Sequence, residues 1–135
     1  MTKNQGETDL QVLLSRMSPR LLDEAFAFCT TTPERASMLG QAAIAVVRED
    51  EGVTLVLPTP VAEQAGLPFV GAWACITLTV HSSLSAVGFL AAISARLAAR
   101  GISLNPVAGY YHDHLFVPWE QRHDALAVLA SFRPD

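Results

Sequence analysis

Apolar residues in the second half of the chain follow two different periods, one typical of a strand and one of a helix. In residues 72–81, aliphatic side chains alternate with semi-polar ones from Ile76 to Val80, which predicts a strand that faces a core on one side. In residues 84–100, apolar side chains recur at intervals of three and four, which predicts a helix with one buried face. Gly101 suits the left-handed residue at its C-terminal end.

The remaining residues of this half predict a hairpin and a second helix. Residues 102–110 are expected to return as a strand, 111–113 to turn and 115–117 to pair back. Apolar residues at helical spacing mark the buried face of the last helix, and they are Ala125, Val128, Leu129 and Phe132. The predicted order of elements is βαββα.

The first half predicts the same order with shorter helices. A packing helix at residues 10–17 should end at Ser18-Pro19, because the residue before a proline disfavours helical backbone. Next come a strand, a helical turn, two strands of a hairpin and a short helix, at residues 26–30, 34–39, 42–47, 53–57 and 61–65. The repeated order predicts an α+β protein built as a degenerate structural repeat.

Composition limits how this repeat can fold. Half of the 135 residues are apolar, which suffices for one good core or for a core shared by two small modules. We expect a flexible N-terminus at residues 1–9, a reduced module at 10–68 and a complete module at 69–135.

Charge and hydropathy exclude several classes of partner. The net charge is −4 and the nine basic residues are not clustered, so no nucleic acid is expected to bind. The helix at 84–100 is too short for a membrane span, which needs about 20 apolar residues, so no membrane partner is expected. The polar, acidic start of the chain has no secretory pattern, which predicts a cytoplasmic protein.

Cys29 and Cys75 lie in apolar runs and are expected to be reduced core residues.

Polar residues gather at the predicted turns, from which loops can contact a small ligand while the scaffold stays rigid. Ser82 or Ser83 is placed to cap the helix predicted at 84–100. The free amides of that helix start would attract an anionic group such as an amino-acid carboxylate. The candidate ligand-binding residues are His81, Ser82, Ser83, Asn105, His112 and Asp113.

Four phrases of the sequence resemble the ACT domain family, specifically its small bacterial two-module proteins of unassigned function. They are LTVHSSLSAVG at 78–88, Gly-Ile-Ser with Asn105 at 101–105, VAGYYHDHLFVP at 107–118 and EGVTLVLP at 51–58. The resemblance covers residues 10 to 132, and it extends distantly to the tandem ACT modules of the CASTOR arginine sensors.

The resemblance implies a ferredoxin-like sandwich in which four antiparallel strands carry helices on one face, and the chain is expected to hold two such modules, the first of them reduced. ACT modules typically sense amino acids or other small metabolites at interfaces between modules. The ligand loop of the family corresponds here to His81 to Leu84, and the strand residues facing it correspond to Asn105, Val107, Ala108 and the turn at 111–114.

We therefore expect non-catalytic binding of a small metabolite such as an amino acid at the seam between the modules, with no cofactor. The serine amides and hydroxyls would hold a carboxylate, and Asp113 would hold an ammonium group. The semi-polar face of the strand at 72–81 needs cover, so we also expect a homodimer.

Three alternatives stay open. A structural or protein-interaction module would bind no ligand and would depend on an interface residue such as Trp73. The His-Asp-His run at 112–114, with His81, could hold zinc in a small metal-dependent hydrolase, although Asp113 is more simply a turn former. Ser82, His81 and Asp113 could form a catalytic triad, but the chain has no G-x-S-x-G nucleophile elbow.

Overall fold

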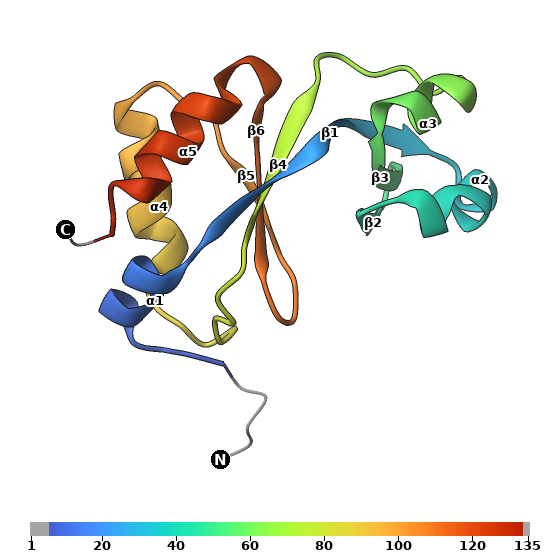
Figure 1. Cartoon of the computed structure of the whole chain (residues 1–135). Coiled ribbons are helices and arrows are strands. Elements are labelled where there is room, and N and C mark those ends of the chain that lie inside the picture. Colours follow the sequence, from blue (N-terminus) through green and yellow to red (C-terminus); the bar gives the residue numbers. More distant parts are fainter. Residues whose placement is uncertain (1–5, 134–135) are drawn as a thin grey trace. The chain divides into compact units, whose positions relative to one another are not determined.

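Figure 1 shows the computed structural model of the chain, which describes residues 6–133. These residues form two compact units. The first unit runs to Leu22 and resumes at Ala74, and the second comprises Asp23–Trp73. Each unit has its own hydrophobic core. Of the N-terminal segment predicted to be flexible, residues 1–5 lie outside the described part of the chain.

Each half of the chain has the order βαββα, which confirms the predicted repeat. Helix α1 (Leu10–Arg16) comes first. The first half then contains β1 (Pro19–Thr31), α2 (Pro33–Leu39), the 3-10 turn η1 (Gly40–Ala42), β2 (Ala45–Glu49), β3 (Gly52–Pro58) and α3 (Thr59–Gln64). The second half contains β4 (Trp73–Leu78), α4 (Phe89–Ala99), β5 (Asn105–Ala108), β6 (Asp113–Pro118), the 3-10 turn η2 (Trp119–Gln121) and α5 (Arg122–Ala130). Among the described helices, none has the length and apolarity to cross a membrane.

The second unit is built on antiparallel strands in the order β2-β3-β1. A tight turn joins Glu49 to Gly52, which face each other across the hairpin of β2 and β3. The central strand β3 is buried at Leu55 and Leu57, and α3 adds Ala62 to the same core. Alternate residues of β3, namely Val53, Leu55 and Leu57, therefore face the core of this unit.

In the first unit the strands follow the order β1-β4-β6-β5. Only the first residues of β1, up to Leu22, belong to this unit. Two hydrogen bonds join the end of β4 to the start of β1. Thr79 donates its main-chain N–H to the carbonyl oxygen of Met17 at 2.9 Å. The Thr79 hydroxyl donates to the carbonyl oxygen of Ser18 at 2.8 Å. These bonds hold α1 beside the sheet, because Met17 and Ser18 directly follow that helix.

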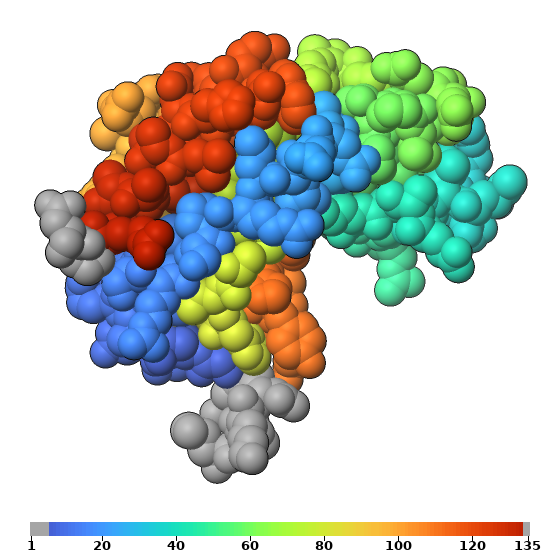
Figure 2. Space-filling view, viewed as in Figure 1, coloured from blue at the N-terminus to red at the C-terminus, as the bar shows by residue number. Residues whose placement is uncertain are grey.

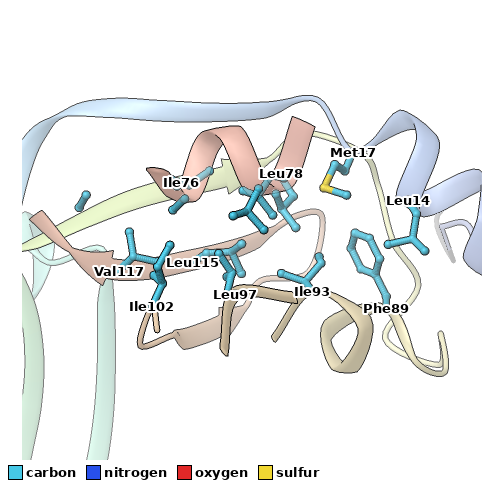
Figure 3. Close-up of a cluster of buried hydrophobic side chains, with 14 of the residues drawn as sticks. Leu14, Met17, Ile76, Leu78, Phe89, Ile93, Leu97, Ile102, Leu115 and Val117 are labelled. Carbon is cyan, nitrogen blue, oxygen red and sulfur yellow. The ribbon is translucent and has the colours of Figure 1, made fainter. Parts of the chain in front are cut away.

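Helices α1, α4 and α5 cover one face of this sheet with an apolar core (Figure 3). Helix α4 contributes Phe89, Ile93 and Leu97 at intervals of four residues, which is one helical face. They pack in one cluster with fully buried strand residues such as Ile76 and Leu115. Burying one such aliphatic side chain stabilises the fold by about 1.5–3 kcal/mol.

The predicted helix at 84–100 is wrong at its start, because α4 begins at Phe89. Gly88 is its N-cap and has φ +90°, a left-handed conformation that glycine adopts without steric cost. Strand β4 also ends earlier than predicted, at Leu78. Residues 79–88 are therefore a loop, and neither Ser82 nor Ser83 caps the helix.

Several strand boundaries also differ from the prediction. Strand β5 is limited to Asn105–Ala108, whereas the sequence predicts a strand over residues 102–110. Strand β1 begins at Pro19 because its first residues belong to the sheet of the first unit. Strand β2 begins at Ala45, since the 3-10 turn η1 uses part of the run predicted as strand. The predicted turn at 111–113 is wrong at Asp113, which opens β6 and lies opposite Ala108 in the ladder.

Candidate ligand pocket

The loop after β4 makes its own turn before α4 begins. The Ser83 hydroxyl accepts a hydrogen bond from the Ser85 N–H at 3.0 Å. The Ser83 carbonyl oxygen accepts another from the Ala86 N–H at 3.0 Å. Serine favours such local bonds to its own backbone, which is why these residues form a turn and not the first turn of a helix. The loop then reaches Gly88 and enters α4.

Ser82 and Asp113 form a buried polar pair next to this turn. The Ser82 hydroxyl donates to Oδ2 of Asp113 at 2.9 Å. Their exposed fractions are 8% and 6%, and they are the two polar residues buried within 6–133. Withdrawing a carboxylate from water is costly unless hydrogen bonds replace the lost hydration. The buried hydroxyl and carboxylate therefore indicate a site where a polar group of a ligand could form a hydrogen bond.

This pair lies on the wall of a pocket of about 180 Å³. Ser82, Ser83 and Asp113 provide its polar side chains, and Ala108 contributes from β5. The other lining residues come from the loop and the first turn of α4, and they are Leu84, Ala86, Gly88, Phe89, Leu90 and Ala91. Pockets for drug-sized ligands measure roughly 300–1,000 Å³, so this one suits a smaller molecule.

The start of α4 gives the pocket a positive wall. The first hydrogen bond of the helix joins the Ala92 N–H to the Gly88 carbonyl oxygen at 2.9 Å. The N–H groups before that bond have no acceptor within the helix, and they belong to Phe89, Leu90 and Ala91. The N-cap residue Gly88 has no side chain that could accept a hydrogen bond from them. The helix dipole adds about half a positive charge at this end. The pocket thus combines a carboxylate with donors that favour an anion.

The six residues predicted from the sequence fall into two groups. Ser82, Ser83 and Asp113 line the pocket together. Asn105 is exposed and lies opposite Phe116 at the far end of the β5–β6 ladder. His112 is half-buried in the hairpin turn, where its carbonyl oxygen accepts from the Gly109 N–H at 2.9 Å.

His81 does not line the pocket, and its ring packs on the two tyrosines at the tip of the β5–β6 hairpin. Its ring centroid lies 5.1 Å from that of Tyr111 and 6.3 Å from that of Tyr110. The His81 Nε2 atom is buried and has no hydrogen-bond partner among the described residues. Figure 2 shows the orange hairpin tip beside the yellow segment that follows β4. The loop and the hairpin thus support each other through aromatic contacts.

His114 is a possible zinc ligand and part of the turn expected to face the ligand loop, and the structure gives it a side-chain partner on β4. Its Nδ1 lies 2.9 Å from the Thr77 hydroxyl, which joins β6 to β4. Burial lowers the pKa of His114, the neighbouring His112 lowers it further, and Asp113 opposes the shift. Neutral imidazole is thus favoured at this position.

The geometry does not match the nucleophilic or metal chemistry considered from the sequence. The Ser82 hydroxyl is bound to Asp113, and no Ser82–His81 bond of the triad kind forms. Burial raises the pKa of the Cys75 thiol to about 11, with an opposing hydrogen bond from Thr77, so this thiol is a poor nucleophile at neutral pH. Within residues 6–133, no three His, Cys, Asp or Glu side chains come together as metal ligands.

The second unit has an open pocket at the corresponding place in its own βαββα order. It is lined by the β1–α2 connection at Thr30 to Pro33 and by the β2–β3 hairpin at Arg48 to Val53. The Thr54 hydroxyl donates to the Glu49 carboxylate beside it. No buried carboxylate lies in this part of the described chain, so the polar pair of the first unit has no counterpart here.

The repeated βαββα order, with antiparallel strands and a hydrophobic core in each unit, defines a protein of two tandem ferredoxin-like modules. Two ACT domain models match the sequence, one over residues 5–74 and the other over 72–131. The chain belongs to the ACT domain family. No curated protein matches it.

Solved structures support the same assignment. A Vibrio cholerae protein of unknown function, described as a possible transport protein, is 46% identical with a TM-score of 0.83, and the match covers 93% of this chain and 96% of that one. An Agrobacterium tumefaciens protein shares 18% identity and a TM-score of 0.68, over 84% and 87% of the two chains. The ligand-free regulatory subunit of aspartate kinase from Thermus thermophilus shares 12% identity and a TM-score of 0.58, over 87% and 97%. The last two likenesses show the fold alone.

Proposed function

We propose that the protein is a non-catalytic regulatory ACT protein that binds a small α-amino acid in the pocket of its first unit. The observation that carries the proposal is the buried Ser82–Asp113 pair, which lines a small pocket together with the first residues of α4, a helix whose start has no side-chain cap. An α-amino acid has an anionic and a cationic group a short distance apart. A site with both complementary charges can recognise the two groups together.

Each group of the ligand has a partner of suitable chemistry. The amides of Phe89, Leu90 and Ala91 would receive the carboxylate, as helix N-termini receive anions elsewhere. The Asp113 carboxylate would accept from the ammonium group. The apolar lining, which includes Ala108, and the volume of about 180 Å³ favour a small apolar side chain.

A regulatory role without catalysis agrees with the chemistry of the pocket. The Ser82 hydroxyl donates to the Asp113 carboxylate, and among the described residues it makes no hydrogen bond to an imidazole of the kind that activates a serine nucleophile in a Ser-His-Asp triad. The fold shared with the regulatory subunit of aspartate kinase is consistent with such a role. A ligand signal from this chain would then pass to a separate protein.

A thermal-shift screen against the twenty amino acids tests the proposal. A ligand that binds only the native state raises the melting temperature by mass action, by an amount equal to about 2.7 kcal/mol of stability at a hundredfold excess over Kd. We expect at least one small apolar amino acid to produce a shift. Asp113→Asn should abolish it, while the exposed, charge-matched control Asp124→Asn should keep it. A shift that survives Asp113→Asn would contradict the proposed site.

A second candidate, an interaction module that forms a homodimer, is favoured by exposed apolar side chains near the pocket. Leu84 and Val87 are 70% and 84% exposed, and Tyr110 and Tyr111 are more than half exposed. Scattered apolar residues are common on surfaces, but neighbouring ones mark interfaces. Light scattering should then report a dimer that Tyr111→Ala weakens, with the exposed Val70→Ala as control. A monomer at high micromolar concentration would contradict this candidate.

A further inference from the structure

The N-terminal segment before α1 binds the pocket loop through its main chain. The Glu7 N–H donates to the His81 carbonyl oxygen at 2.8 Å, and the Ser83 N–H donates to the Glu7 carbonyl oxygen at 2.8 Å. Glu7 and Ser82 thereby form a parallel β-bridge. The two bonds fix the peptide groups on both sides of Ser82, the residue whose hydroxyl reaches Asp113.

Gly6 permits this contact. It has φ +81°, and a Cβ added to it would lie 2.8 Å from the Ser82 carbonyl carbon, 2.8 Å from the Ser83 nitrogen and 2.9 Å from the His81 carbonyl oxygen. All three atoms belong to the main chain, so they cannot move aside as the end of a flexible side chain would. A side chain at this position is therefore incompatible with the bridge as it stands.

The same segment is tied to the core at its other end. The Glu7 carboxylate accepts from the N–H groups of Thr8 and Asp9 at 3.0 Å each, which holds a turn. The Asp9 carboxylate accepts from the Val12 N–H at 3.1 Å and so caps α1. Helix α1 in turn buries Leu13 completely. The segment thus connects a fixed helix to a loop that has no regular structure of its own.

We propose that residues Gly6 to Asp9 are a clamp that holds Ser82 against Asp113 and thereby sets the affinity of the pocket. Gly6 and Glu7 are positioning residues, since they act on the pocket only through Ser82. This inference rests on the proposed function for its effect on affinity. Its effect on the loop is independent of any ligand, because an unclamped loop samples more conformations.

Amide hydrogen exchange measured by NMR on the full chain tests the clamp without a ligand. Gly6→Ala should speed exchange at the Ser83 amide by up to about tenfold, as expected from losing one hydrogen bond. Gly71→Ala is the matched control, because Gly71 has a similar φ of +75° but open space around its Cβ position. Equal Ser83 exchange rates in the two folded variants would overturn the clamp.

A second variant keeps the test decisive if Gly6→Ala does not fold. Glu7→Pro removes the N–H that binds the His81 carbonyl oxygen and leaves Gly6 in place, so Ser83 exchange should again accelerate. Unchanged exchange in this variant would overturn the clamp as well.

Titration with the twenty amino acids then separates the two proposals. A weaker affinity in Gly6→Ala than in Gly71→Ala, for whichever amino acid binds the unaltered protein, supports the clamp as an affinity-setting element. Equal affinities in both variants overturn that role. If no amino acid binds the unaltered protein, the proposed function fails, and the exchange experiment decides the clamp by itself.

Discussion

A carboxylate that loses contact with water needs compensating hydrogen bonds, and Asp113 receives one from the Ser82 hydroxyl. The sequence places both residues among the candidates, but the helix cap expected of Ser82 or Ser83 is wrong, and so is the turn expected at Asp113. Short polar side chains serve in caps, turns and buried pairs alike, so the pattern alone does not distinguish these roles. The pairing depends on a contact between residues far apart in the sequence.

Removing the hydroxyl of Ser82 should destabilise the fold. Ser82→Ala leaves the Asp113 carboxylate buried without its hydrogen bond, and hydrogen bonds to charged groups contribute about 1.5–3 kcal/mol. Urea unfolding followed by circular dichroism measures the change in free energy of unfolding. Ser85→Ala, in the exposed part of the same loop, should change it by less than about 0.5 kcal/mol. Equal effects of the two variants would contradict the buried pair.

Acidification should destabilise the protein through His114. Burial lowers the pKa of His114 in the folded state below its ordinary value of 6.5, so the unfolded chain binds a proton more readily. The stability that the neutral ring contributes is therefore complete above pH 6.5 and is lost as the pH falls below that value. Melting temperatures between pH 8 and pH 5 should fall less in His114→Gln than in the control His123→Gln, whose altered side chain is exposed. An identical pH dependence in both variants would refute this assignment.

At the scale of elements, the order of strands and helices was predictable, but several of their ends were not. Alternating and helical periods identify an element through its buried face, and β4 and α4 both have such faces. The start of α4 was missed because Leu84 and Ala86 continue the apolar pattern while the backbone is broken at Gly88. The left-handed conformation of Gly88 follows from the turn that precedes it, which periodicity does not report.

The face of α4 that packs on the sheet should dominate its contribution to stability. Leu97→Ala removes a fully buried side chain from the core and should cost about 2–5 kcal/mol. Leu84→Ala removes the same atoms from a side chain that is 70% exposed, in the loop that was predicted to be part of the helix. It should cost less than about 0.5 kcal/mol. Comparable losses in chemical denaturation would contradict the observed start of α4.

At the scale of the whole molecule, the chain repeats one βαββα plan and belongs to the ACT domain family. The repeat was predictable because each half has its own hydrophobic pattern, and the family was predictable from phrases such as the one at 107–118. The module boundary expected after residue 68 stays a prediction. The bridge from Glu7 to the loop at 81–83 had no signal in the sequence, since it uses main-chain atoms that every residue carries.

The most direct test of amino-acid binding is an NMR titration of the full chain with each of the twenty amino acids, monitored at the backbone amides. A ligand whose carboxylate meets the start of α4 should shift the amides of Phe89, Leu90 and Ala91 most strongly, and the exposed Asn105 should stay unchanged. If no amino acid shifts these three amides at millimolar concentration, the pocket does not bind amino acids as proposed.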